Sequence, residues 1–362
     1  MWPFKSKSQS CLGIDIGTSS IKLIQLKKSD ERYELETYGE LQTYGYLEKL
    51  NDPFQTKSLK LLESQVIEML KRTMKESEIS TKKAVMSIPV FSSFIGIINL
   101  PPMSENELSQ ALSFEAKRYV PVPLSEVKVD WKIIEKEKVE SSKSRKKNIF
   151  KFRILLVAVP KEIIAKHIRI ANAVKLKLTG LELESFSYIR SLLGNDKSTS
   201  CILDMGARST SFTVVDRGFI QSSHSLDIAG TELTKALSHS MGVDFKRAEI
   251  YKREKGLDHK TPNSGEEIKD ILLTYIDKII TEAKRMINNY QEESKRKVTK
   301  LILSGGSGNL IGLKDYLANK LGLEIIKANP WARINYPIVL KPVLKKLAPR
   351  FAVVTGLAMR NL

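Results

Sequence analysis

Two stretches of this sequence resemble each other: GIDIGTSSIKL at residues 13–23 and ILDMGARSTSF at residues 202–212. In both, an apolar run reaches Asp-x-Gly, crosses small or hydroxyl-bearing residues and resumes as an apolar run. This pattern is typical of a β-hairpin that turns tightly at glycine. Because the two copies lie a whole domain apart in the chain, they indicate that a domain has been duplicated.

A pair of such hairpins has the chemistry of a phosphate clamp. Glycine lets backbone N–H groups approach phosphate oxygens closely, and small hydroxyls add further donors. Lys22 is expected to meet a phosphate as a point charge. Asp15 and Asp204 are expected near Mg²⁺, mostly through its water shell, because magnesium dehydrates reluctantly. The other predicted phosphate contacts are Gly17, Thr18, Ser19, Gly206, Ser209 and Thr210. One hairpin alone is more often an ordinary turn, but two at domain spacing favour ATP with Mg²⁺.

A third glycine cluster, SGGSG at residues 304–308, follows the apolar run 301–303 and precedes a predicted helix at 313–321. It does not match a dinucleotide fingerprint, because Ile311 stands where a small residue is required, and it lacks the GK[ST] of a P-loop. A strand followed by glycines and a helix suits a backbone platform for adenine or the α-phosphate. Gly305, Gly306 and Ser307 are therefore predicted nucleotide contacts.

Apolar periodicity places the remaining elements coarsely. One amphipathic helix is expected at residues 59–74. Pro101 and Pro102 are expected to end a strand at 94–100, before a capping box at residues 104–107 starts a helix whose apolar stripe includes Tyr119. A charged loop is expected at 136–148, and a final helix at 349–359 carries small residues that allow close packing.

The composition narrows the class of protein. The chain is 42% hydrophobic and 28% charged, as in soluble globular proteins, and no apolar run approaches the ~20 residues of a membrane span. The first residues lack the apolar core of a signal peptide, so we expect a cytoplasmic location. Cys11 and Cys201 each precede a strand that is expected to be buried, so they are expected to be core residues rather than a disulfide.

The net charge of +18 requires an explanation. Nucleic acid, an anionic membrane surface and an acidic protein are all candidate partners, as is a balance that only serves solubility. No aromatic-interleaved basic groove or nucleic-acid motif accompanies the lysines, so nucleic acid is not expected. A place beside an anionic membrane explains the charge at least as well, because each Lys or Arg near such a surface contributes about 1 kcal/mol.

Taken in order, these motifs resemble the actin/Hsp70/sugar-kinase superfamily of ATP-binding proteins over nearly the whole chain. The resemblance implies an α/β fold, namely a duplicated actin-like ATPase (ribonuclease H-like) fold. It implies that Glu184 corresponds to the acid that places a water or metal in hydrolysing relatives. It also implies nucleotide contacts from the glycine turn at Gly230 and from an A-E-x-x-K helix that contains Glu249 and Lys252.

Within that superfamily, three features resemble the PilM family of type IV pilus assembly proteins. They are an aromatic-basic leader at residues 1–7, the segment FEAKRYVPVP at 114–123, and an insertion whose strand-helix-strand-strand-helix order is shared with the cell-division protein FtsA. Val122 departs from the family pattern, which has an aromatic residue there. Arg208, beside the second phosphate turn, is a further departure; it either helps a phosphate or, as is more common for such arginines, points to solvent.

The resemblance implies a division into domains. The first actin-like domain is expected at residues 1–198, with residues 340–362 returning to it and an inserted subdomain at 91–178. The second is expected at 199–339, with a helical subdomain at about 241–298.

The family resemblance also implies a role. Proteins of this family bind ATP and capture the cytoplasmic N-terminal tail of PilN, an inner-membrane protein, so we expect an ATP-dependent scaffold at the inner face of the cytoplasmic membrane. Pilus motor ATPases, an anionic membrane surface and self-association are further partners that the resemblance leaves open. We expect slow or undetectable hydrolysis, since turnover requires an in-line water and a well-placed acid. The alternatives are a sugar kinase of the same superfamily and an FtsA-like filament-forming division protein.

Overall fold

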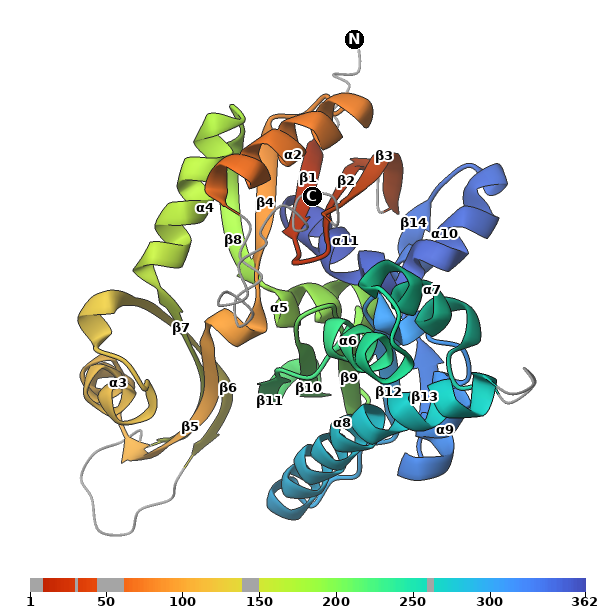
Figure 1. The fold of residues 1–362 in the computed structure, drawn as a ribbon. Helices are drawn as coiled ribbons and strands as arrows, with labels where there is room; N and C mark the ends of the chain where they lie inside the picture. Colours follow the sequence, from red (N-terminus) through yellow and green to blue (C-terminus); the bar gives the residue numbers. More distant parts are fainter. Residues whose placement is uncertain (1–8, 30–31, 44–61, 139–149, 259–263) are drawn as a thin grey trace.

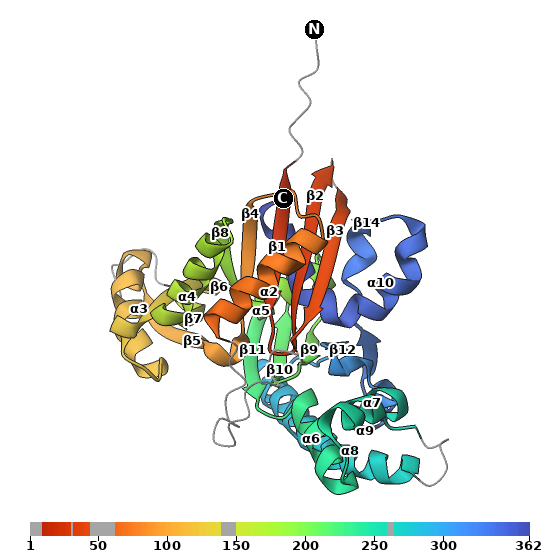
Figure 2. The same cartoon turned by 45° about the horizontal axis from the view of Figure 1, so that its top comes forward.

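The computed structural model describes residues 9–29, 32–43, 62–138, 150–258 and 264–362. Two large sheets are joined by helices that lie between them, and a small third sheet projects from one flank (Figures 1 and 2). The predicted loop at 136–148 and the leader at 1–7 lie mostly or wholly outside the described residues. Within the described ranges, no helix is long and apolar enough to cross a membrane.

The first large sheet is covered by helices on both faces. Its layer consists of β1 (Ser10–Ile16), β2 (Ser20–Ser29), β3 (Arg32–Gln42), α2 (Glu63–Glu76), β4 (Lys83–Ile88), α4 (Lys161–Ala173), β8 (Lys177–Leu183), β14 (Ile334–Asn335) and α11 (Ala352–Ala358). The strand order is β14-β3-β2-β1-β4-β8. Alternate residues of β1 face opposite sides, as period-two alternation requires. Leu12 and Ile14 pack with α2 and α4, whereas Cys11 packs with α11 on the other face.

The second large sheet repeats the theme. Its layer consists of β9 (Ser200–Met205), β10 (Thr210–Asp216), β11 (Phe219–Leu226), α6 (Gly230–Met241), α7 (Phe245–Lys255), α8 (Ser264–Ser294), β12 (Lys300–Ser304), α9 (Leu313–Leu321) and β13 (Glu324–Lys327). The strand order is β11-β10-β9-β12-β13. The long helix α8 covers one face, where Leu203 and Phe212 share a buried cluster with Leu272, Ile276 and Ile279.

The helices between the two sheets are α5 (Glu184–Tyr188), the π-helical turn η3 (Ile189–Leu193) and α11. One core cluster contains Val85 of the first sheet, Ile202 of the second, and Tyr188 and Val353 between them. The chain can approach closely here because glycine is present: a Cβ at Gly13 would lie 2.2 Å from the carbonyl oxygen of Val354. The predicted helix at 349–359 is divided into a 3₁₀ turn, η7 (Ala348–Phe351), and α11.

The third sheet is small and carries a helix on one face. Its elements are β5 (Phe94–Met103), α3 (Glu105–Tyr119), β6 (Val127–Lys138) and β7 (Phe150–Pro160), and its strand order is β5-β7-β6. The predicted capping box is confirmed, since the Ser104 N–H donates to Glu107. Two details were predicted wrongly. β5 runs through Pro101 and Pro102 with a shift in register, and Tyr119 is exposed instead of joining the buried stripe.

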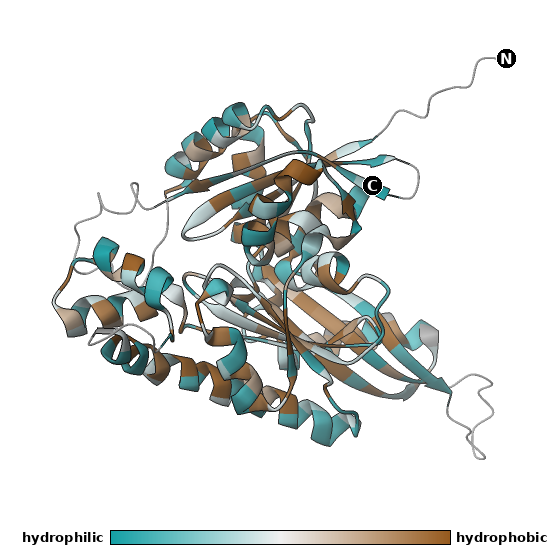
Figure 3. Cartoon of the chain, turned by 90° about the vertical axis from the view of Figure 1, so that its right-hand side faces the viewer, coloured by the Kyte–Doolittle hydropathy of each residue, from teal (hydrophilic) through white to brown (hydrophobic). Residues whose placement is uncertain are grey.

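Hydropathy follows this layering, with apolar strands inside and polar faces outside (Figure 3). Cys11 and Cys201 are free and buried, which confirms the prediction that they are core residues. Burial raises the pKa of the Cys11 thiol to about 11 and that of the Cys201 thiol to about 12.

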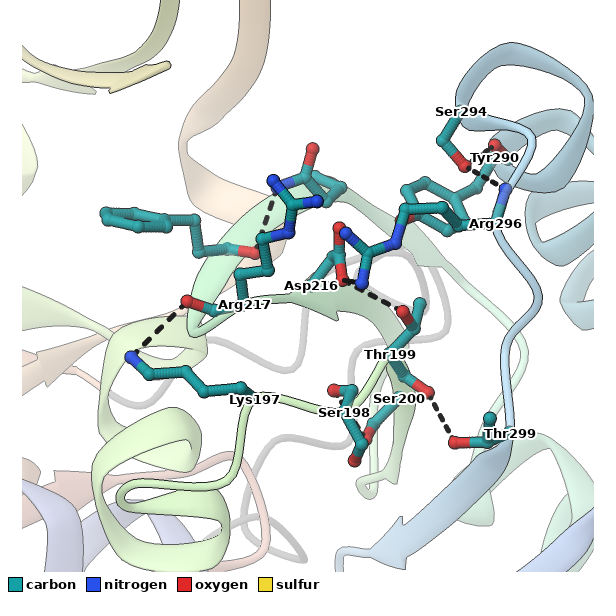
Figure 4. Close-up of polar contacts among 12 residues, drawn as sticks. Lys197, Ser198, Thr199, Ser200, Asp216, Arg217, Tyr290, Ser294, Arg296 and Thr299 are labelled. Carbon is teal, nitrogen blue, oxygen red and sulfur yellow. Dashed lines mark hydrogen bonds and ion pairs between the residues drawn. The ribbon is translucent and has the colours of Figure 1, made fainter.

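The end of the second sheet that lies away from the glycine turns is held by side chains. The Thr199 hydroxyl donates to the Asp216 carboxylate at 2.8 Å, and Arg296 pairs with the same carboxylate at 3.0 Å (Figure 4). Arg217 and Gly218 follow with φ of 52° and 83°, a left-handed pair that turns β10 into β11. This end of the hairpin is thus complete without a ligand.

Candidate functional site

A cleft of about 850 Å³ lies between the two large sheets. It is lined by the turns of both Asp-x-Gly hairpins and by the third glycine cluster. The structure therefore brings together segments that lie far apart in the sequence. The predicted residues that line the cleft are Asp15, Gly17, Thr18, Ser19, Lys22, Glu184, Asp204, Gly206, Ser209, Gly230, Glu249, Lys252, Gly305, Gly306 and Ser307.

The first hairpin turns between β1 and β2. The Gly17 N–H donates to the Ser20 carbonyl at 3.0 Å, which closes the turn. Lys22 lies opposite Asp15 in the strand register, and its ammonium group is 3.2 Å from Asp15 Oδ2. The Ser87 hydroxyl donates to Asp15 Oδ1 at 2.8 Å. Both oxygens of the first carboxylate therefore already have partners within the protein.

Lys22 supplies a largely buried positive charge on the first side of the cleft. Burial by itself would lower the pKa of its ammonium group, but the negative charges of Asp15 and Glu40 raise that pKa overall. The side chain is therefore protonated at neutral pH and is available to a phosphate.

The second hairpin has the same backbone and different chemistry. The Gly206 N–H donates to the Ser209 carbonyl at 3.1 Å, as in the first turn. Across the strand pair, however, Asp204 lies opposite Ser211. Ser211 lines the cleft, is nearly fully buried, and its hydroxyl has no hydrogen-bond partner among the described residues. Within that same part of the chain, Asp204 forms no ion pair.

Thr210 does not reach the cleft, so its predicted phosphate contact is wrong. Its position in the hairpin corresponds to Ile21, which is buried, because neighbouring residues of a strand face opposite sides. The Thr210 hydroxyl donates to the Ile228 carbonyl at 2.6 Å, and the side chain is fully buried.

Two carboxyl groups in the cleft have raised pKa values. Burial raises the pKa of Asp204 to about 6, while the hydroxyls of Tyr188 and Ser304 partly oppose that change. Burial, followed by the charges of Asp15 and Asp204, raises the pKa of Glu184 well above its usual range. Both groups would gain from a cation brought into the cleft, because a positive charge favours their ionised forms.

Glu184 begins α5 and faces the cleft, as its predicted role requires. One of its carboxylate oxygens accepts a hydrogen bond from the Val90 N–H at 3.1 Å. Val90 starts the short turn η1 (Val90–Ser92), which leads into β5. Glu184 therefore connects the cleft to η1, the segment that leads into the third sheet.

Lys252 and Glu249 line the cleft but are held mainly by the protein. The Lys252 ammonium group donates to the Gly230 carbonyl at 2.8 Å, to the Thr234 hydroxyl at 2.7 Å and to Glu249 at 2.6 Å. These contacts use all three of its protons. Burial lowers the pKa of Lys252, and only part of that change is offset by Glu249. The pair joins α7 to the start of α6.

The start of α6 is in turn fixed to the second hairpin. The N–H groups of Gly230 and Thr231 donate to the carbonyls of Gly206 and Ala207, at 3.0 and 2.8 Å. A Cβ at Gly230 would lie 2.4 Å from the Ser307 hydroxyl, so glycine is required by close approach. Ser307 itself donates to the Gly206 carbonyl at 3.2 Å. Gly230 and Ser307 thus support the second turn.

The third glycine cluster forms another wall of the cleft. Gly305 has a φ of 85°, and a Cβ there would lie 2.4 Å from the Met205 carbonyl oxygen. Its N–H donates to the Pro349 carbonyl at 2.9 Å. Arg350, beside this wall, pairs with Glu40 of β3 at 3.2 Å. Glu40 and Arg350 both line the cleft and were missed from the sequence, since neither belongs to a local motif.

Arg208, for which the sequence left open a phosphate contact or a place in solvent, crosses the cleft. Its guanidinium group lies 4.6 Å from the centre of the Phe91 ring, in η1. A cation over an aromatic face is attracted by the ring's electrons. This contact links the second phosphate turn to the chain segment that enters the third sheet, and no sequence signal indicated it.

The carboxylates fit Mg²⁺ held through water. Among the described residues, no group of three or more His, Cys, Asp or Glu side chains is arranged to bind a metal directly. Magnesium bound to a nucleotide needs only one or two carboxylates, because phosphates and water supply its other ligands. Asp15 and Asp204 line one cleft and supply that number.

A family model described as type IV pilus assembly protein PilM matches residues 13–362. Among solved structures, one of a PilM–PilN type IV pilus biogenesis complex is similar, with 22% identity, a TM-score of 0.78, and coverage of 97% of this chain and 98% of that one. MreB5 of Spiroplasma citri bound to AMPPNP is similar at 12% identity and a TM-score of 0.54, covering 98% and 96%. FtsA of Staphylococcus epidermidis is 19% identical over 356 residues, which cover 87% of this chain and 73% of the relative. The predicted actin-like fold is confirmed.

Proposed function

The chain belongs to the PilM family of type IV pilus assembly proteins, and on this basis we propose that it is a scaffold whose conformation is set by Mg-ATP. The observation that carries the proposal is the pair of matching glycine turns that line one cleft. Each turn is closed by its own hydrogen bond, so its shape exists before a nucleotide binds. A triphosphate between them would be held from both large sheets.

The carboxylates of Asp15 and Asp204 are not equally available to bind a metal ion. Asp15 is engaged by Lys22 and Ser87, whereas Asp204 forms no ion pair with a described residue. We therefore assign the water shell of Mg²⁺ mainly to Asp204, with Asp15 holding Lys22 in place. When bound, the ion would neutralise phosphate charge. Lys22 would supply a second positive charge from the opposite hairpin.

Two contacts connect the nucleotide cleft to the third sheet. Arg208 in the second turn contacts Phe91, and the neighbouring Val90 donates to Glu184. Both contacts meet in η1, which leads directly into β5. A shift of the second turn on nucleotide binding would thus act on the segment from which the third sheet projects. This arrangement supports signalling through conformation.

We expect little hydrolysis at this site. Glu184 is the candidate acid, but its carboxylate accepts a hydrogen bond from the Val90 backbone. Orientation of an attacking water would compete with that bond. Nucleotide at about 1000 times its dissociation constant would stabilise the fold by about 4 kcal/mol without turnover.

The partner we propose is the cytoplasmic N-terminal tail of a PilN-type membrane protein. A similar solved structure is that of a PilM–PilN complex, and the net charge of +18 suits a protein beside an anionic membrane. The chain would then work in the cytoplasm at the inner face of that membrane.

The test is binding of a fluorescent tail peptide with and without Mg-ATP. We expect about tenfold tighter binding with Mg-ATP, within the usual range of coupling between two sites. Gly206→Val should remove the nucleotide effect, because a Cβ there would lie 2.9 Å from the Ser209 carbonyl oxygen. The control is Gly242→Asn, at a left-handed helix end where a Cβ would have no atom within 4 Å. Equal peptide affinity in both nucleotide states would contradict the proposal.

A further inference from the structure

An apolar tip projects from the first sheet between β14 and the end of α10. Ile338 and Val339, in the turn η6 (Ile338–Leu340), are 83% and 77% exposed, and Val343 in α10 (Lys341–Leu347) is 48% exposed. Large aliphatic side chains that gather on a surface mark an interaction site more often than single ones do. We call these three residues the apolar tip.

The tip is held rigidly from below. Leu344 is fully buried in a cluster with Trp331 and Phe351. The Trp331 indole N–H donates to the Leu344 carbonyl at 2.8 Å. The inner face of α10 is therefore fixed, and the outward position of its exposed residue, Val343, follows from that anchoring.

The surroundings of the tip are basic. Residues 325–362 contain no Asp or Glu. Lys341 and Lys345 are exposed beside the tip. Strand β3, which pairs with β14, carries carboxylates that already have partners. These are Glu34 with Lys27, Glu36 with Gln25, and Glu40 with Arg350.

We propose that the apolar tip and its lysines contact an anionic lipid bilayer, with the tip entering the headgroup region. Apolar side chains ringed by lysine suit such a surface, because burial of the former and attraction of the latter add. The tip belongs to the flank opposite the third sheet (Figures 1 and 2), which leaves that sheet free for another partner. Contact of the tip with a bilayer does not depend on the proposed nucleotide response.

A second copy of the chain fits the tip less well. A two-fold contact would place the same patch against itself, so that lysines meet lysines, and like charges oppose association. Three side chains are also far fewer than the roughly 20 to 30 residues a side of a stable protein interface. An anionic bilayer is complementary to both the apolar side chains and the lysines of this surface.

The experiment is co-sedimentation of the full chain with vesicles of phosphatidylglycerol and phosphatidylethanolamine, and with vesicles of phosphatidylcholine alone. We expect binding to the anionic vesicles only. Ile338→Asp with Val339→Asp should weaken it by about tenfold or more, from lost burial and added negative charge. Lys341→Glu with Lys345→Glu should weaken it similarly, and more so at low salt.

The matched control is Ile168→Asp, an exposed isoleucine on α4 between Lys166 and Arg169. It should bind vesicles like the unchanged chain, and an unaltered midpoint of urea denaturation in every variant would show that the fold is intact. Binding by the Ile338→Asp, Val339→Asp protein equal to that of the unchanged chain would overturn the proposal. So would a dimer that depends on Ile338 and Val339 in the absence of vesicle binding, since it would assign the tip to a second copy.

Discussion

The two Asp-x-Gly hairpins share a backbone and differ in how their charges are satisfied. In the first, Asp15 faces Lys22 across the strands and accepts a second bond from Ser87. In the second, Asp204 faces Ser211, whose hydroxyl has no partner among the described residues. The charge of the first carboxylate is balanced within the protein, whereas the second hairpin has no cation at the matching position.

The two hairpins therefore have the same fold but different roles. A buried charge is costly unless it is paired. The first hairpin contributes to the fold without a ligand, while the second has more to gain from a bound Mg²⁺ with its nucleotide. At the far end of β10, the other strand of this hairpin, Asp216 is paired with Arg296, so its charge is satisfied (Figure 4).

Asp15→Ala should have the largest effect on the difference between the hairpins. This change leaves Lys22 buried without its main partner, which usually costs about 3–5 kcal/mol. We expect a loss of about 3 kcal/mol in the free energy of unfolding, because Glu40 still favours the Lys22 charge. Urea denaturation without nucleotide measures it. Glu34→Ala breaks a surface pair with Lys27 and should cost far less, because solvent screens that pair. Equal losses in the two variants would contradict the structural role of Asp15.

Asp204→Ala should have the opposite effect: it should weaken Mg-ATP binding and leave the stability of the free protein unchanged. We expect no loss of stability without nucleotide, because burial disfavours this carboxylate more than the hydroxyls of Tyr188 and Ser304 favour it. Mg-ATP affinity should fall about tenfold to hundredfold. Titration calorimetry with Mg-ATP provides the measurement. Asp216→Ala, at the far end of the same hairpin, should leave affinity unchanged. A destabilised Asp204→Ala protein with normal affinity would show that the two hairpins play the same part.

Thr210→Val tests whether Thr210 faces away from the cleft, as the strand register indicates. The Ile228 carbonyl would lose its hydrogen bond, so the free energy of unfolding should fall by about 1 kcal/mol. Mg-ATP affinity should not change. Ser209→Ala, next to it and lining the cleft, should weaken Mg-ATP binding with little effect on stability. Weaker nucleotide binding by the Thr210→Val protein would restore its predicted role as a phosphate ligand.

The smallest effect is expected for Arg208→Ala, in the hairpin without a cation opposite its Asp. Loss of the contact with Phe91 removes about 0.5–1 kcal/mol, so ATP should dissociate about threefold faster in stopped-flow measurements. Lys132→Ala removes another cation from an aromatic ring, Phe219, between the third and second sheets. It should leave the rate unchanged. If both variants release ATP alike, the crossing of the cleft by Arg208 is irrelevant to nucleotide binding.

The site was predictable from the sequence where one short segment carries the whole signal. Gly17 and Gly206 occupy the same place in equivalent turns, and both line the cleft as predicted. Lys252 was predicted in position but not in partner, because its three contacts come from α6 and α7 together. Glu40 and Phe91 gave no signal, since each becomes part of the cleft only when distant segments pack.

The sequence by itself determined the duplicated hairpins and the core strands, because alternation and glycine turns depend on neighbours a few residues apart. Only the tertiary structure decided which charges have partners. Ser87 reaches Asp15 from another strand, and Arg208 reaches Phe91 from another sheet. It also decided that Ile338 and Val339 remain exposed. Burial and charge pairing are properties of surfaces that meet in space, and no local pattern encodes them. The two Asp-x-Gly turns could therefore be found in the chain, but the difference between them could not.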